Sequence, residues 1–464
     1  MRSGSNLENM NFKKVSVIGA AKSGIAAVKY FVARGVSVFI SECCGSERLS
    51  QILQTEGLSH LEYEASGHSD TVLNSDLIIL SPGVRSDLDI LIKAKEAGIP
   101  VWSEMELGFR ISKAPFLAVT GSSGKSTTVS LLGAAMTSAG FNAVVAGNIG
   151  LPVVSVTPEL EEDSFVVAEV SSFQLETVDK FRPRVAAVLN FMKNHLDRYS
   201  GEEEYYEAKK RIAMNLGTND FLVLNMHDSR LLAWAEQMSK KTQIIFFGHE
   251  ETSGDSVFFK NGSIRYNFNG KSGIILENVS EMKLGGRHNY ENACAAAAVA
   301  LAAGAQAEGI AKGICSFGGL PHRLEYVGEI GNVAFYNDSK STTAESIECA
   351  LRAFDSKIHL IAGGKDKGCD FSVINEAVKQ SVKSITLIGE AKERMMSQWK
   401  GLAPIQTAES LEQAVEVAFK NAVDSEKVIF SPGCSSFDMF KNFEHRGDCF
   451  RSIIGKLISQ RCLK

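Results

Sequence analysis

The amino-acid sequence predicts an α/β protein built from about three domains. Short apolar runs alternate with helix-like segments along most of the chain, which is typical of parallel sheets with crossover helices. The chain has 464 residues, more than one hydrophobic core usually accommodates. We place the three domains at residues 1–105, 106–319 and 320–464.

Composition excludes several classes of protein. The formal net charge is −5, whereas a nucleic-acid-binding surface needs a concentrated basic face. The nine cysteines lack metal-like spacing and suit a reducing compartment. The N-terminus has no apolar core of a signal peptide, and the alanine-rich run 293–303 is too short to span a bilayer. We therefore expect a cytoplasmic monomer that binds no nucleic acid and does not insert into membranes.

The first predicted domain opens with strand, turn, helix and strand, over residues 15–18, 19–24, 25–34 and 36–40. The turn resembles a dinucleotide fingerprint, but Ala21 replaces the glycine that lets the backbone approach a pyrophosphate, which argues against a nicotinamide cofactor. Glu42 either binds a ribose or base or is a solvated loop acid. Residues 81–83 (Ser-Pro-Gly) end a further strand, where sheet ligands commonly bind. We predict a Rossmann-like domain that holds a nucleotide-linked ligand.

The strongest motif runs from Pro115 to Thr128 and reads PFLAVTGSSGKSTT. A buried strand over residues 116–119 leads into a glycine loop and then a helix over residues 126–139. Backbone N–H groups of the loop, the helix N-terminus and Lys125 form a phosphate cradle, and the Ser126 hydroxyl can hold Mg²⁺. The loop is shorter than the common four-residue spacing between glycines, so a serine-rich turn is the alternative.

Three later segments of the second domain bear on metal binding. Glu169 ends a buried strand over residues 165–170, and a buried carboxylate needs a cation such as Mg²⁺; a water-facing acid is the alternative. His195 and Asp197 follow a strand over residues 185–190 and can reach one site, although a lone histidine is more often structural. The charged helix over residues 202–214, taken by itself, indicates a solvated face.

The third predicted domain follows a hinge at residues 318–323, where two glycines precede a proline. Its expected strands cover residues 334–337, 358–362, 385–388 and 427–431. Polar clusters end three of these strands, at residues 338–342, 363–367 and 431–436. Lysine with serine or threonine at strand carboxyl ends suits an anionic substrate that carries carboxylates.

The motifs together resemble the Mur ligase family of ATP-dependent amide-forming enzymes. The signals occur in the family's order: TGSSGKST, AEVSSFQLE, GRHNYENA, LPHRLE and NDSKSTT. NHLDRYS and SPGCSSFDMFKNFEHRG are similar to the members that add D-glutamate, and the DNPR motif of the diaminopimelate-adding members is absent. The resemblance implies a phosphate-loop mononucleotide-binding central domain and a Rossmann-like C-terminal domain. It also implies that ATP phosphorylates the carboxylate of UDP-N-acetylmuramoyl-L-alanine and that D-glutamate attacks the acyl phosphate.

The resemblance assigns roles to residues where motifs match. Lys125 would neutralise the transferring phosphate, Ser126 and Glu169 would hold a first Mg²⁺, and His195 would serve a second. Lys209 matches a lysine that is carbamylated in the family and lies beside the metal. The implied ATP contacts are Gly121, Ser122, Ser123, Gly124, Lys125, Ser126, Thr127, Asn289, Arg323 and Asp338. The implied UDP-substrate contacts are Lys22, Ser23, Glu42, Ser81, Gly83 and Asn148, and the implied D-glutamate contacts are Lys340, Thr342, Lys367, Ser436 and Phe443, the last through its backbone N–H.

The sequence departs from the family pattern at three positions. Ser123 and Thr343 stand where asparagine is common, and Glu42 replaces a shorter aspartate at the uracil site. The first two changes leave backbone donors intact, and the third leaves uracil recognition open. The rival functions are another amide ligase, such as a folylpolyglutamate synthetase-like enzyme, a nucleotide-binding regulator without ligation, and an oxidoreductase that uses the N-terminal fold.

Overall fold

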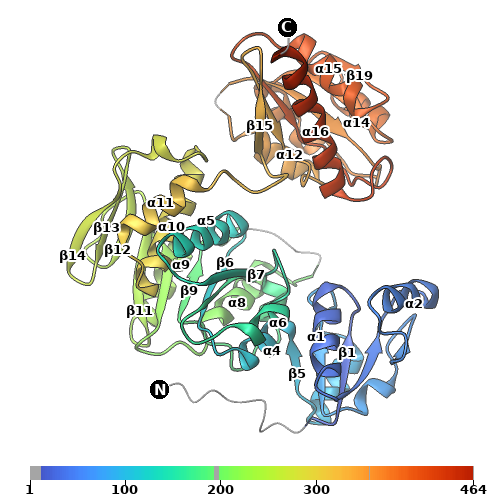
Figure 1. The fold of residues 1–464 in the computed structure, drawn as a ribbon, viewed down its shortest axis with the longest axis vertical. Coiled ribbons are helices and arrows are strands. Elements are labelled where there is room, and N and C mark those ends of the chain that lie inside the picture. The colour runs from blue at the N-terminus through green and yellow to red at the C-terminus, as the bar shows by residue number, and fades with distance from the viewer. Residues whose placement is uncertain (1–11, 193–197, 355, 463–464) are drawn as a thin grey trace. The chain divides into compact units, whose positions relative to one another are not determined.

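The computed structural model describes residues 12–192, 198–354 and 356–462. The chain divides into two compact units, Met1–Phe317 and Gly318–Lys464 (Figure 1). The division falls at the predicted hinge. The described residues form three sheets, two in unit 1 and one in unit 2, and each sheet is the centre of one α/β region. This arrangement agrees with the predicted fold class.

The first sheet of unit 1 is parallel throughout, with the strand order β3-β2-β1-β4-β5. Its strands are β1 (Lys14–Ile18), β2 (Ser37–Ser41), β3 (Glu62–Glu64), β4 (Leu77–Leu80) and β5 (Val101–Ser103). Its helices are α1 (Lys22–Val32), α2 (Ser46–Thr55) and α3 (Asp89–Glu96). The predicted strand–turn–helix–strand opening is confirmed, but α1 begins at Lys22 instead of Ile25, so the second half of the predicted turn is its first helical turn.

The second sheet of unit 1 has nine strands in the order β14-β13-β12-β11-β10-β9-β6-β8-β7. Its strands are β6 (Phe116–Thr120), β7 (Ala143–Gly147), β8 (Phe165–Glu169), β9 (Val185–Val188), β10 (Phe221–Asn225), β11 (Gln243–Gly248), β12 (Ser256–Lys260), β13 (Ser263–Phe268) and β14 (Lys271–Leu276). The strands from β7 to β12 pair in parallel, and β12 to β14 form antiparallel hairpins. The turn after Lys260 closes the first hairpin, and Asn261 and Gly262 adopt the positive φ that such a turn requires.

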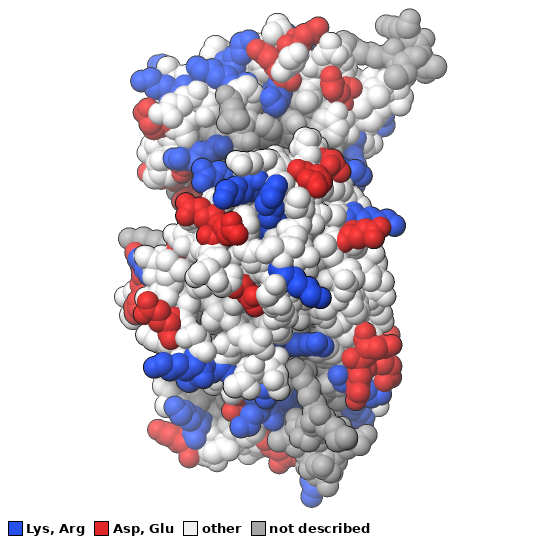
Figure 2. All heavy atoms as spheres, turned by 90° about the vertical axis from the view of Figure 1, so that its left-hand side faces the viewer, with Lys and Arg blue, Asp and Glu red and all other residues white. Residues whose placement is uncertain are grey.

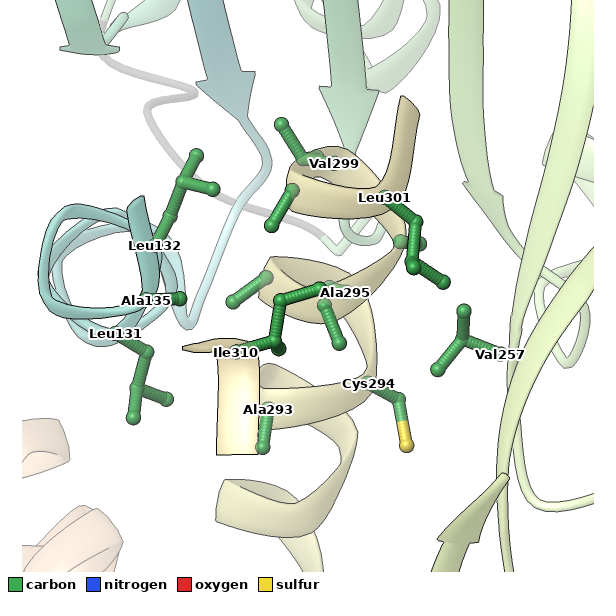
Figure 3. Close-up of a cluster of buried hydrophobic side chains, with 14 of the residues drawn as sticks. Leu131, Leu132, Ala135, Val257, Ala293, Cys294, Ala295, Val299, Leu301 and Ile310 are labelled. Carbon is green, nitrogen blue, oxygen red and sulfur yellow. The ribbon is translucent and has the colours of Figure 1, made fainter. Parts of the chain in front are cut away.

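Helices cover both faces of this sheet with separate hydrophobic clusters. They are α4 (Glu104–Ile111), α5 (Lys125–Ser138), α6 (Val153–Val156), α7 (Ser172–Leu175), α8 (Glu202–Lys210), α9 (Ser229–Met238), α10 (Arg287–Ala303) and α11 (Ala307–Ser316). The small side chains of α10 lie between α5 and β12 (Figure 3). A Cβ atom on Gly313 would lie 2.4 Å from the carbonyl oxygen of Ala134, so α11 packs against α5 because this residue is glycine.

Unit 2 contains a six-stranded sheet in the order β15-β16-β20-β17-β18-β19. Its strands are β15 (Glu325–Ile330), β16 (Val333–Asn337), β17 (Ile358–Gly363), β18 (Val382–Ile388), β19 (Ile405–Thr407) and β20 (Lys427–Phe430). Its helices are α12 (Ala344–Leu351), α13 (Asn375–Ser381), α14 (Lys392–Gln398), α15 (Leu411–Asn421) and α16 (Phe443–Cys462). β15 is antiparallel to β16 and the other pairings are parallel. The four predicted strands are present, and β16, β20 and β17 are neighbours.

Figure 2 shows basic and acidic side chains interspersed on one face of the molecule. Over the described residues, every helix is too short or too polar to cross a bilayer.

Candidate active site

The predicted phosphate loop connects β6 to α5, at the carboxyl edge of the parallel strands. Gly121 has a φ of 153° and Gly124 a φ of 82°, both in the region that favours glycine. A Cβ atom at Gly124 would lie 2.5 Å from the Asn292 side-chain oxygen, so this position also lacks room for a side chain. The strand, loop and helix therefore have the predicted form, and the loop is tightly constrained.

Asn190, just beyond the end of β9, holds the phosphate loop in place. Its Oδ1 accepts hydrogen bonds from the backbone N–H of Ser122 (3.0 Å) and of Ser123 (2.9 Å), and its Nδ2 donates to the Ser123 carbonyl (3.2 Å). The Ser122 hydroxyl donates to the carbonyl of Met192 and accepts from its N–H. Asn190 was predicted only as the last residue of a strand, and its contacts with the phosphate loop were not predicted. Its position at the end of a strand beside the phosphate-loop strand was the available signal.

Two lysines meet at one backbone oxygen of the loop. The carbonyl of Gly121 accepts hydrogen bonds from Lys125 Nζ (2.8 Å) and from Lys209 Nζ (2.9 Å). Lys209 comes from α8 and is 1% exposed, and its ammonium group also lies 4.4 Å from the centre of the Tyr205 ring. A solvated helix face, the interpretation from charge pattern alone, is therefore wrong for Lys209, although Glu203, Glu204 and Glu207 on the same helix are exposed.

The surroundings of Lys209 disfavour its charged form. Burial, together with the positive charge of Lys125, lowers the pKa of Lys209 to about 6, although Glu169 acts in the opposite direction. A lysine with this pKa is largely a neutral amine near pH 7 and can act as a nucleophile. We use the name phosphate-loop edge for residues 121–126 together with Glu169 and Lys209.

Glu169 lies at the end of β8 and is 1% exposed. Its Oε1 accepts a hydrogen bond from Asn148 Nδ2 (2.7 Å), and its Oε2 has no hydrogen-bond partner among the described residues. Leaving a buried carboxylate oxygen unpaired is costly, so this atom suits a cation. Ser126, in the first turn of α5, is also buried and offers a second oxygen ligand. His195, the third predicted ligand, lies outside the described residues.

The first turns of α10 and α5 are linked by asparagines. Asn292 Oδ1 accepts from the Thr128 hydroxyl (3.2 Å), and Asn292 Nδ2 donates to Asn289 Oδ1 (3.4 Å). Asn289, a predicted nucleotide contact, is 6% exposed and donates to the Gly285 carbonyl (2.8 Å). The structure thus brings Asn289 close to the phosphate loop through Asn292, a residue that the sequence analysis did not single out. Thr127 is half-buried on α5.

Five of the six predicted UDP-substrate residues surround the turn between β1 and α1, whereas Asn148 follows β7 and donates to Glu169. Glu42 accepts hydrogen bonds from the N–H groups of Ala20 (2.6 Å) and Cys43 (2.8 Å), and these bonds lower its pKa even though partial burial raises it. Ser81 is buried, and its hydroxyl donates to the Gly19 carbonyl (2.9 Å). Glu42 and Ser81 therefore shape this turn from within. Exposed or half-buried positions beside it are Lys22, Ser23 and Gly83.

The three polar clusters of unit 2 follow β16, β17 and β20, which are adjacent, and we call residues 338–342, 363–367 and 431–436 the C-terminal edge. Asp338 accepts hydrogen bonds from the Ser431 hydroxyl (2.8 Å) and from the Leu324 N–H (3.2 Å). Burial raises the pKa of Asp338 to about 7, although these bonds and the charges of Arg323 and Arg446 oppose the shift. Arg323, on the preceding loop, thus lies near Asp338.

The predicted amino-acid contacts of unit 2 differ in accessibility. Ser436 is buried and Phe443 is half-buried, and the Phe443 ring centre lies 5.8 Å from Lys340 Nζ. Thr342 and Lys367 are exposed. Arg446, which the sequence analysis missed, is 1% exposed and donates to the carbonyls of Ser339 (2.7 Å) and Cys434 (2.9 Å). Arg446 therefore connects the clusters at residues 338–342 and 431–436 through their backbone carbonyls.

Comparisons with known proteins cover nearly the whole chain. The profile of the Mur ligase MurD-like N-terminal domain matches residues 13–103, that of the Mur ligase middle domain residues 119–300, and that of the Mur ligase glutamate ligase domain residues 322–434. A UDP-N-acetylmuramoylalanine--D-glutamate ligase of Geotalea uraniireducens is 40% identical over 446 residues, which cover 96% of this chain and 98% of the relative. One of Geotalea daltonii is 39% identical over 452 residues, covering 97% and 99%.

Solved structures show the same fold. UDP-N-acetylmuramate-alanine ligase from Thermotoga maritima superimposes with a TM-score of 0.59 at 18% identity, covering 96% of this chain and 100% of that one. The predicted order of three α/β domains, N-terminal, central and C-terminal, is thereby confirmed. The domain boundaries after residues 105 and 319 stay predictions. The chain belongs to the Mur ligase family.

Proposed function

We propose that this protein catalyses the ATP-dependent addition of D-glutamate to UDP-N-acetylmuramoyl-L-alanine, an amide-forming step of peptidoglycan precursor synthesis. The observation that carries the proposal is the meeting of Lys125 and Lys209 at the Gly121 carbonyl of a preformed phosphate loop. The names of the relatives that match along nearly the full chain support the choice of substrates.

The chain's own groups suit a two-step reaction. A carboxylate oxygen of the UDP-linked L-alanine attacks the γ-phosphorus, and ADP leaves. The D-glutamate amine then attacks the acyl carbon, loses a proton and expels phosphate. Lys125 and the loop N–H groups stabilise charge on the phosphoryl oxygens, and such preorganised electrostatic stabilisation is usually the largest contribution to catalysis.

We propose that Mg²⁺ accompanies ATP at the phosphate-loop edge. The unpartnered Oε2 of Glu169 and the buried hydroxyl of Ser126 are the hard oxygen ligands that this ion prefers. When bound, the ion supplies neutralising charge for the triphosphate. A second ion at His195 rests on the family resemblance, since that residue lies outside the described ones.

We further propose that Lys209 reacts with carbon dioxide, so that the amine and CO₂ give a carbamate and release one proton. Lys209 lies near Lys125, whose positive charge would stabilise the carbamate anion. The low pKa supports the step, because a neutral amine is the form that attacks.

The remaining assignments are proposals of the same kind. Residues 1–105 would bind the UDP substrate, residues 106–319 ATP, and residues 320–464 the amino acid. The nucleotide contacts proposed outside the loop are Asn289, Arg323 and Asp338; the UDP-substrate contacts are Lys22, Ser23, Glu42, Ser81, Gly83 and Asn148; the D-glutamate contacts are Lys340, Thr342, Lys367, Ser436 and Phe443.

A phosphate-release assay with each substrate omitted in turn tests the proposal. We expect release to require ATP, UDP-N-acetylmuramoyl-L-alanine and D-glutamate together. Turnover with L-glutamate or L-alanine in place of D-glutamate would identify a different amide ligase. ADP formation that ignores both acceptors would point to a nucleotide-dependent regulator instead.

A further inference from the structure

Arg198 and Glu176 join two distant parts of unit 1. The Arg198 guanidinium donates to both carboxylate oxygens of Glu176, with Nε to Oε1 at 3.0 Å and Nη2 to Oε2 at 2.7 Å. Nη2 also donates to the Val84 carbonyl (3.0 Å), and Nη1 reaches the Pro82 carbonyl at 3.5 Å. Val84 and Pro82 belong to the loop that leaves β4, in the sheet of the N-terminal domain, whereas Glu176 follows α7 of the central domain.

The Glu176 carboxylate receives further hydrogen bonds from both sides of this junction. The Tyr199 hydroxyl donates to its Oε1 (2.6 Å), and the Ser86 hydroxyl, from the loop after β4, donates to its Oε2 (2.7 Å). Arg198 also stacks on Phe173, with its guanidinium carbon 4.2 Å from the ring centre. The side chains of Arg198 and Glu176 are 12% and 11% exposed, so their attraction is weakly screened.

We propose that Arg198 and Glu176 are positioning residues that hold the loop after β4 in its substrate-binding position. The inference rests on the proposed function, in which Ser81 and Gly83 of this loop contact the UDP-linked substrate. We use the name β4-loop clamp for Arg198, Glu176 and Ser86.

A cavity lies beside the β4-loop clamp, and it makes the position of the loop after β4 depend on the clamp. This cavity of about 390 Å³ is lined by Arg85, Ser86 and Asp87 of the loop, by the clamp, by Ala208 of α8 and by Arg211 just after that helix. Side chains that face a cavity lose packing contacts on that side. On this side, the loop is therefore held mainly by the hydrogen bonds that Arg198 donates to the Pro82 and Val84 carbonyls. These directional bonds set the position and orientation of the loop.

A second buried arginine of unit 1 offers a matched control. Arg110 donates to Glu106 (2.7 Å) and Asp179 (2.7 Å), stacks on Trp102 at 4.0 Å, and is 7% exposed. The segment that carries Asp179 leads into the start of β9, where the Arg184 N–H donates to the Phe116 carbonyl at the start of β6. This segment therefore lies at the amino ends of the parallel strands, opposite the ends that carry the phosphate loop. Arg110 thus has similar chemistry, and among the described residues its ion pairs and ring contact do not include the loop after β4.

The test compares Arg198→Ala with Arg110→Ala in the full-length protein, using steady-state phosphate release and calorimetric binding of UDP-N-acetylmuramoyl-L-alanine without ATP. For Arg198→Ala we expect KM and Kd for the UDP substrate to rise by about tenfold to a hundredfold, as for a misplaced binding group, while KM for ATP changes less than about twofold. For Arg110→Ala we expect a lower melting temperature and unchanged KM values. Equal KM changes in the two variants would contradict the proposal.

Milder variants keep the test valid if Arg198→Ala folds poorly. Glu176→Gln keeps the shape and weakens the ion pair, and Arg198→Lys keeps the charge but loses the bidentate geometry. Both are expected to raise KM for the UDP substrate by less than Arg198→Ala does. Normal KM in Glu176→Gln and Arg198→Lys, with both proteins folded, would overturn the role of the clamp. Failure of the proposed function looks different, because the wild-type protein itself would then show no turnover or binding.

Discussion

The phosphate-loop edge of unit 1 and the C-terminal edge of unit 2 both lie where parallel strands end. The two edges differ in how completely their buried ionisable side chains are hydrogen-bonded. In unit 1, Lys209 is a buried amine with a pKa of about 6, and Glu169 has an oxygen with no described partner. In unit 2, Asp338 is hydrogen-bonded to Ser431 and Arg446 to Ser339, and Thr342 and Lys367 are exposed. Unit 1 therefore pairs a buried amine with an unpaired carboxylate oxygen, whereas unit 2 has braced loops that present exposed contacts, with the Ser435 hydroxyl as a neutral buried group that has no hydrogen-bond partner among the described residues.

The largest expected effect comes from the buried amine. Lys209→Ala should lower turnover by about a thousandfold, because it removes the proposed carbamate anion from the electrostatic environment of the transferring phosphate. If the active form is a carbamate, short carboxylic acids such as formate or acetate should partly restore phosphate release. Full activity of Lys209→Ala without added acid would contradict the proposed role.

Asp338 allows the pH dependence of the C-terminal edge to be measured. Its pKa is about 7 in the folded protein and near 4 in an unfolded chain, so the folded state retains the proton between these values. This contribution to stability is present at acidic pH and is lost as the pH rises through about 7. Relative to Asp338→Asn, the wild type should lose about 2 kcal/mol of unfolding free energy between pH 5 and pH 8.

Denaturant unfolding of both proteins across this pH range checks the prediction. Wild-type protein and Asp338→Asn are compared at each pH, and the variant serves as the reference without a titrating group. A gap between them that stays constant with pH would show that Asp338 is ionised throughout, and that its internal hydrogen bonds outweigh its burial.

A smaller effect is expected from the brace of the phosphate loop. Asn190→Ala should raise KM for ATP by about tenfold, because the Ser123 N–H loses its acceptor and the Ser122 N–H keeps only the backbone carbonyl of residue 190. KM for D-glutamate should stay unchanged. Steady-state kinetics with each substrate varied separately measures both values, and an unchanged KM for ATP would show that the loop holds its form without Asn190.

The smallest effect should come from an exposed contact of unit 2. Thr342→Ala removes one hydroxyl that points outward, so KM for D-glutamate should rise by about threefold, the effect of one neutral hydrogen bond. Thermal stability should not change. An effect as large as that of Lys209→Ala would mean that this edge also depends on a single group.

Much of this architecture was predictable because local patterns and tertiary contacts agree. The apolar runs of β6, β8 and β10 are fully or almost fully buried strands, and the glycines of the phosphate loop need the positive φ that they adopt. Several strands were not predicted, and β7 and β15 show why. β7 is only partly buried along its length, and β15 carries two glutamates and a glycine with partial burial, so neither shows the periodicity of a core strand.

The site was less predictable where tertiary contacts override local pattern. Lys209 lies in a highly charged helix, and its burial depends on the approach of α8 to the phosphate loop, which no local pattern encodes. Asn190, Asn292 and Arg446 act through hydrogen bonds to residues far along the chain. Lys209 could be named beforehand through the family resemblance, whereas these three positions could not.

The most direct test of the account is a crystal structure with a non-hydrolysable ATP analogue and Mg²⁺. We expect the β- and γ-phosphates on the N–H groups of residues 121–126, beside Lys125, with the metal on the free oxygen of Glu169. A nucleotide bound elsewhere, or a phosphate loop left empty at saturating analogue, would contradict the assignment of the active site.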